Sequence, residues 1–198
     1  MAVALLLAVA QSSFALEPIP LVRDLLGPPP QGVGLSAGDQ KGVLAEREVF
    51  ARARLTGRQY RVQSVMLVNA GLARTREIMT RFDRFAGLVP YVEKAEWNPE
   101  TKRLLVAGGI WRYYLQSVLQ FSEVSPLKWE FTVIGGHFFG MKGYMQFETA
   151  APGQTLVVFS SQVEGDHFPP KWVIERGAEI VFAVTGRRVR SLVEDLNL

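Results

Sequence analysis

The fold of this chain is decided at its C-terminal end, in the stretch from Phe168 to Leu198, which reads FPPKWVIERGAEIVFAVTGRRVRSLVEDLNL. Apolar residues recur there at steps of three and four, which is the period of an amphipathic helix. Pro169 and Pro170 open the stretch and no proline interrupts it, so we expect a helix of about 25 residues, roughly 37 Å long. The apolar stripe of this helix comprises Val173, Ile174, Ala178, Val181, Phe182, Val189, Leu192, Val193 and Leu196.

A helix of that length needs an equally long apolar surface to lie against, and the segments that precede it supply one. Their apolar residues alternate with polar residues, which predicts strands, and turns rich in Gly, Pro and Asn separate them. Strands linked in this way, with one apolar and one polar face, are typical of an antiparallel sheet. The expected strands are Glu48–Leu55, Gln59–Val68, Val92–Trp97, Arg103–Ala107, Ile110–Ser122, Lys128–Ile134, Phe139–Phe147 and Thr155–Val163.

A shorter helix is expected from about Leu72 to Phe85, where Ile78, Met79 and Phe82 would share one face. The order is therefore two strands, a helix, a run of strands and a long terminal helix. This order predicts an α+β fold in which the terminal helix lies across the concave face of a curved antiparallel sheet.

The N-terminal part reads differently from the rest. Residues 1–15 form an apolar run that ends in the small-x-small pattern Ser13-Phe14-Ala15, which predicts a secretory signal peptide and a periplasmic or secreted protein. The run is too short to span a bilayer. Residues 16–45 are rich in Pro and Gly and are expected to be irregular, and residues 46–198 are expected to form one domain.

Composition narrows the possible functions. The 198 residues carry a formal net charge of +3 and contain no cysteine. Without cysteine there are no disulfides, thiolate metal sites or cysteine nucleophiles. No dense basic stripe indicates nucleic-acid binding. We expect no cofactor, no metal site and a monomer that makes transient contact with a membrane surface.

Three features of the sequence resemble a known family. They are Val65–Ala70 leading into Arg76–Met79, the segment Phe82–Val92, and the meander closed by the long C-terminal helix. Together they resemble the START-like, or SRPBCC, helix-grip superfamily, which includes polyketide cyclases and coenzyme-Q-binding proteins. The resemblance covers about residues 46–198. It implies a curved antiparallel sheet wrapped around the terminal helix, with a deep apolar cavity between them for a lipid, sterol, polyketide or quinone.

A stripe of aromatic and Met side chains on the expected sheet would line such a cavity, with flexible Met side chains adapting to the shape of the ligand. The same stripe is also what a filled core contains, and from the residues alone both interpretations stand. The expected ligand-binding residues are Trp111, Tyr113, Leu115, Phe131, Met141, Met145, Phe147 and, from the terminal helix, Ile174 and Ala178.

Polar candidates are few. Glu164, Asp166 and His167 could form an acid/base or metal cluster, but their spacing favours a polar turn. His137 is the second histidine. Arg112 could pair with a ligand carboxylate. However, the alternation of residues along the strand places it on the face opposite the apolar side chains, which favours contact with solvent. Three arginines near the end of the terminal helix could meet anionic lipid headgroups, but a simple interaction with the helix dipole is favoured: Arg187, Arg188 and Arg190.

Three functions fit this sequence. The first is a non-enzymatic protein that binds or carries a hydrophobic small molecule, and no catalytic residue is assigned for it. The second is a cyclase or hydrolase that needs a general acid or base in the cavity, for which the candidates are Glu164, His137, His167 and Tyr113. The third is a module with a filled core that binds a partner.

Overall fold

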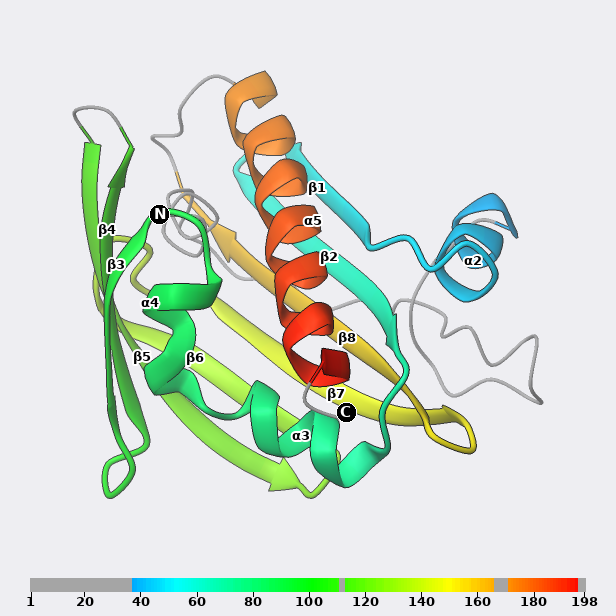
Figure 1. Ribbon diagram of the computed structural model, residues 1–198. Helices are drawn as coiled ribbons and strands as arrows, with labels where there is room; N and C mark the ends of the chain where they lie inside the picture. Colours follow the sequence, from blue (N-terminus) through cyan, green and yellow to red (C-terminus); the bar gives the residue numbers. More distant parts are fainter. Residues whose placement is uncertain (1–36, 111–112, 166–170, 196–198) are drawn as a thin grey trace.

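The computed structural model describes residues 37–110, 113–165 and 171–195. Figure 1 draws the rest as a grey trace. The expected signal peptide and most of the segment 16–45 lie outside the described residues, so these boundaries stay predictions. Trp111, Arg112, Asp166 and His167 also lie outside them. The side chains of Tyr113 and Ile174 are not described either, although their backbones belong to a strand and a helix.

The described strands form one antiparallel sheet of eight strands, which confirms the expected curved antiparallel architecture. The strand order is β1-β2-β8-β7-β6-β5-β4-β3, so the last strand of the chain pairs with the second. This pairing brings both ends of the domain to the same part of the sheet, beneath the terminal helix. The strands are β1 (Phe50–Thr56), β2 (Gln59–Val68), β3 (Val92–Asn98), β4 (Arg103–Ile110), β5 (Tyr113–Ser125), β6 (Lys128–Gly136), β7 (Lys142–Ala151) and β8 (Gln154–Glu164).

The terminal helix α5 (Lys171–Asp195) has 25 residues and lies across the concave face of the sheet, as expected (Figure 1). Ala178, Val181, Val189 and Val193 form the buried face of this helix. Gly186 brings the helix close to the sheet: a Cβ atom there would lie 2.6 Å from Cγ1 of Val49. The α+β helix-grip arrangement is therefore present in the described residues.

The segment expected as one helix from Leu72 to Phe85 is broken. It contains α3 (Leu72–Met79), a 3₁₀ turn η2 (Phe82–Arg84) and α4 (Phe85–Leu88). The break falls at Arg81, whose ψ of 70° is not helical. Thr80 also turns its hydroxyl back to the carbonyl of Arg76, at 2.9 Å, and such bonds compete with helix continuation. Because of this break, the side chain of Phe82 lies in the core, where it is 1% exposed.

Two other expectations need correction. The segment expected as irregular contains a short helix, α2 (Ala37–Leu44), whose Val43 packs on the convex face against Val65 and Leu67. Phe139 was expected beside Met141 on the apolar face, but it lies in the β6–β7 turn and is 56% exposed. The positive φ of 75° at Phe138 reverses the chain there, so the alternation of a strand does not apply.

One expected strand, Ile110–Ser122, is divided, because β4 ends at Ile110 and β5 begins at Tyr113. Apolar and polar residues alternate without interruption from the end of β4 into β5. This pattern therefore does not show where one strand ends and the next begins. Among the described residues, no helix is both long enough and apolar enough to cross a membrane.

Candidate functional site

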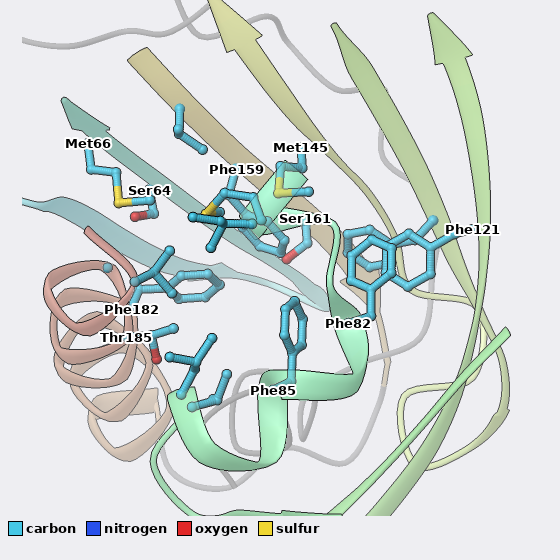
Figure 2. Close-up of a pocket in the computed structure, with 18 of the residues that line it drawn as sticks. Ser64, Met66, Phe82, Phe85, Phe121, Met145, Phe159, Ser161, Phe182 and Thr185 are labelled. Carbon is cyan, nitrogen blue, oxygen red and sulfur yellow. The ribbon is translucent and has the colours of Figure 1, made fainter. Parts of the chain in front are cut away.

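A pocket lies between the concave face of the sheet, α5 and the α3–α4 segment (Figure 2). Its volume is about 130 Å³, counted as space that the centre of a water molecule can occupy. It is about 1040 Å³ when all empty space between the walls and out to the mouth is included. One water needs only about 10–15 Å³ of the first kind, so the core beneath α5 is not solid.

Three sets of elements build the walls. Strands β2, β8, β7, β6 and β5 form the floor, α5 forms one side, and α3, η2 and α4 form the other. The lining side chains alternate along β2 and β8, as expected for one face of a sheet. The lining residues are Ser64, Met66, Ile78, Met79, Phe82, Phe85, Leu88, Val89, Phe121, Phe131, Met141, Met145, Val157, Phe159, Ser161, Phe182, Thr185, Gly186 and Val189.

Aromatic rings fix the shape of these walls. Phe82 stacks on Phe121 with ring centroids 4.2 Å apart, and its edge meets the ring of Phe85 at 5.4 Å. Phe159 on β8 joins the ring of Phe182 on α5 at 4.8 Å. Such pairs stabilise the folded protein by about 0.5–1.5 kcal/mol beyond the effect of their buried area. They therefore fix the positions of the helices relative to the sheet.

The described lining is almost entirely apolar. Its only polar side chains are the hydroxyls of Ser64, Ser161 and Thr185, and no ionisable side chain is among the described lining residues. Within the described residues, no group of three His, Asp or Glu side chains is arranged so that it could hold a metal ion. An apolar pocket of this kind favours an uncharged, hydrophobic occupant.

The structure brings together three of the residues expected to bind ligand. Phe131, Met141 and Met145 line the pocket. Phe147 and Ala178 are fully buried but lie outside its lining, and Leu115 is partly buried against the core. Trp111, Tyr113 and Ile174 have no described side chain.

Most of the lining was missed from the sequence. Met66, Phe159 and the two serines lie on strands that were expected, but nothing in the residues showed that β2 and β8 are neighbours beneath α5. The apolar face of the α3–α4 segment was recognised, yet its contact with the pocket depends on the break at Arg81.

The polar candidates are engaged elsewhere. Nδ1 of His137 is exposed and lies 3.1 Å from the backbone nitrogen of Gln116. Glu164 is 3.9 Å from Arg58. Arg190 donates to the backbone carbonyl of Arg47, which joins α5 to the segment before β1.

The ionisable groups with displaced pKa values also lie outside the lining. Burial raises the pKa of Tyr60 well above its usual 10, and the carboxylates of Glu175 and Glu179 raise it further. Burial raises the pKa of Tyr144 and lowers the pKa of Arg190. These shifts report packing around the sheet and α5, because none of the three side chains reaches the pocket.

Solved structures share this fold. A START superfamily protein from Mycobacterium smegmatis has a TM-score of 0.58 and 15% identity, over 69% of this chain and 98% of that chain. The Zhui aromatase/cyclase from Streptomyces sp. R1128 has a TM-score of 0.56 and 14% identity, over 71% of this chain and 96% of that chain. Ara h 8.0201 has a TM-score of 0.53 and 13% identity, over 68% and 97%.

These likenesses establish the class: the chain has the START-like helix-grip fold. At identities of 15% or less they show the fold alone. No family model matches the sequence, and no curated protein matches it.

Proposed function

We propose that the protein binds a hydrophobic small molecule in the pocket between the sheet and α5, as a carrier and without chemical change to the molecule. The observation that carries this proposal is the pocket, whose described lining is apolar and bears no ionisable side chain. The shared fold supports binding at this place, since the similar structures include a START superfamily protein and an aromatase/cyclase.

The size of the pocket sets the scale of the ligand. An apolar protein cavity of about 150 Å³ holds a benzene ring, and the pocket here has about 130 Å³ of space that the centre of a water molecule can occupy. A larger lipid, isoprenoid or quinone would place one end in this space and extend toward the mouth. The flexible side chains of Met66, Met79, Met141 and Met145 can repack around it.

The enzyme hypothesis gains no support from the described residues. General acid–base catalysis needs a titratable group within hydrogen-bond reach of the substrate. Glu164 and His137 lie outside the pocket lining. The hypothesis of a filled core requires a solid interior, which the pocket beneath α5 contradicts. The place of action we propose, periplasmic or secreted, rests on residues 1–15 alone.

Native mass spectrometry of the protein recovered from the cells that make it tests the proposal. We expect a fraction of the protein to carry an excess mass, which organic extraction releases as an apolar molecule. Protein that is always free of ligand, and that takes up no fatty acid, sterol or quinone when these are supplied, would contradict the proposal.

A further inference from the structure

Two serines interrupt the apolar floor of the pocket. Ser64 lies on β2 and Ser161 on the neighbouring β8, and both line the pocket (Figure 2). They are 7% and 2% exposed. Serine has no packing advantage at a central position of a sheet, where β-branched and aromatic residues are favoured. The two residues therefore call for another explanation.

The register places the serines close together. Ser64 pairs with Phe159, and Ser161 pairs with Val62, so the serines are diagonal neighbours on the same face. Diagonal neighbours in an antiparallel pair lie about 7–8 Å apart. A ligand in the pocket can therefore meet either hydroxyl on this one face of the floor.

Both hydroxyls belong to the pocket lining, and no side-chain hydrogen bond joins Ser64 or Ser161 to another described residue. The third hydroxyl of the described lining, that of Thr185 on α5, is buried without a partner. Ser160 gives the contrast, because its side chain on the opposite face of β8 bonds to Tyr144. A buried hydroxyl without a partner destabilises the folded protein. The arrangement is explained if a ligand supplies the missing partner.

A glycine lies beside Ser161 on the neighbouring strand β7 and lets an aromatic ring pack closely there. Gly143 on β7 pairs with Ser161, and a Cβ atom at Gly143 would lie 2.5 Å from both the carbonyl oxygen of Ser160 and Cζ of Phe131. The ring of Phe131 thus lies over Gly143 and forms an apolar wall beside the hydroxyl. A flat group can lie against this wall while it bonds to the serine.

We propose that Ser64 and Ser161 form a recognition site for a neutral oxygen-bearing group, such as a hydroxyl or carbonyl, at the buried end of the hydrophobic ligand. This inference rests on the proposed function. A carboxylate is excluded as the preferred group, because no cationic side chain is among the described lining residues and an isolated buried charge is strongly unfavourable.

Three probes that share one apolar scaffold test the site: naphthalene, 2-naphthol and 2-naphthoate. Their dissociation constants are measured for the wild type and for the double variant S64A/S161A. Ser→Ala removes only the hydroxyls, so we expect the variant to fold. The ratio of affinities, 2-naphthol over naphthalene, should fall by roughly tenfold in the variant. Binding of naphthalene should not weaken, and 2-naphthoate should bind the wild type most weakly.

S160A is the matched control, since Ser160 lies on the same strand but on the opposite face, and the ratio should not change in this variant. An unchanged ratio in S64A/S161A, with both neutral probes bound, would overturn this inference and leave the proposed function standing. Preference of the wild type for 2-naphthoate would also overturn it. Failure of all three probes to bind the wild type would contradict the proposed function and this inference together.

Discussion

At the scale of single residues, the side chains that matter most are those that break a local rule. Ser64 and Ser161 are polar on an apolar floor, and Gly143 and Gly186 lack a side chain where strand or helix would favour one. Each of these four positions borders the pocket or the contact that shapes it. Such residues do not follow the pattern of apolar and polar residues from which the elements were predicted. For this reason none of them was assigned a role from the sequence.

Gly143→Ala tests the close contact beneath Phe131. The added methyl group would meet the backbone oxygen of Ser160, which cannot move away without distorting β8. We expect the free energy of unfolding to fall by about 1–3 kcal/mol, as for other overpacked sites. Urea unfolding measures the change. Gly87→Ala is the control, because nothing lies within 4 Å of that position, and it should not destabilise the protein.

Tyr60 predicts how the protein responds to alkali. Its pKa in the folded protein lies well above 10 because of burial beside Glu175 and Glu179. In the unfolded chain Tyr60 ionises near pH 10. Above that pH the unfolded state binds fewer protons than the folded state, so stability falls as pH rises. Below about pH 10 the contribution is constant.

Urea unfolding of the wild type and Tyr60→Phe at pH 8 to 11 checks this expectation. Tyr60→Phe should lose less stability between pH 10 and 11 than the wild type does. The exposed Tyr91→Phe serves as the control and should behave like the wild type. Equal losses in all three proteins would show that Tyr60 ionises normally and is not buried as described.

At the scale of elements, α5 is joined to the sheet by hydrogen bonds between its side chains and the backbone of β1, as well as by apolar packing. Glu175 accepts a hydrogen bond from the backbone N–H of Leu55 at 2.8 Å, and Glu179 accepts one from Ala53 at 3.3 Å. Both N–H groups belong to β1, an edge strand. The two carboxylates thus occupy edge groups that could otherwise pair with another chain.

The double variant E175A/E179A should expose this edge. Hydrogen bonds to charged groups contribute about 1.5–3 kcal/mol each in favourable cases, so we expect a measurable loss of stability. Amide hydrogen exchange at Ala53 and Leu55 should become faster, while exchange in the central strand β8 changes only with global stability. R188A, on the exposed side of α5, is the control. Unchanged exchange at Ala53 and Leu55 would contradict the described contact.

The element scale is also where prediction from the sequence worked best. The bounds of β2 were predicted to the residue, and α5 was predicted with its length and its position on the sheet. Long, regular alternation is a strong signal because burial on one face forces it. The α3–α4 segment was predicted as continuous because the break at Arg81 depends on where Phe82 finds space in the core. The position of that space depends on the tertiary structure and cannot be read from local sequence patterns.

At the scale of the whole molecule, the pocket exists because the curved sheet, α5 and the α3–α4 segment do not close on one another. Three of its lining residues were predicted from the sequence, Phe131, Met141 and Met145. The others come from strand neighbours and a broken helix that only the three-dimensional arrangement reveals. The residues alone therefore predicted an apolar stripe, and the space in front of it was expected only from the resemblance to the helix-grip superfamily.

Filling that space tests whether it is real in solution. Val157 lies on the floor and is 3% exposed. Val157→Phe would cost about 1–3 kcal/mol of stability in a solid core. Because the pocket can take the larger side chain, we expect a change below about 1 kcal/mol together with loss of ligand binding. A large destabilisation in thermal or urea unfolding would indicate that the core is filled.

The central claim is that an apolar molecule binds between the sheet and α5. Four of the five methionines line the pocket, namely Met66, Met79, Met141 and Met145. Methyl NMR of protein labelled with ¹³C-methyl methionine, titrated with naphthalene, therefore observes the pocket directly. The account predicts saturable shifts of these four signals. Saturation of the solution with naphthalene without a shift in any of them would contradict it.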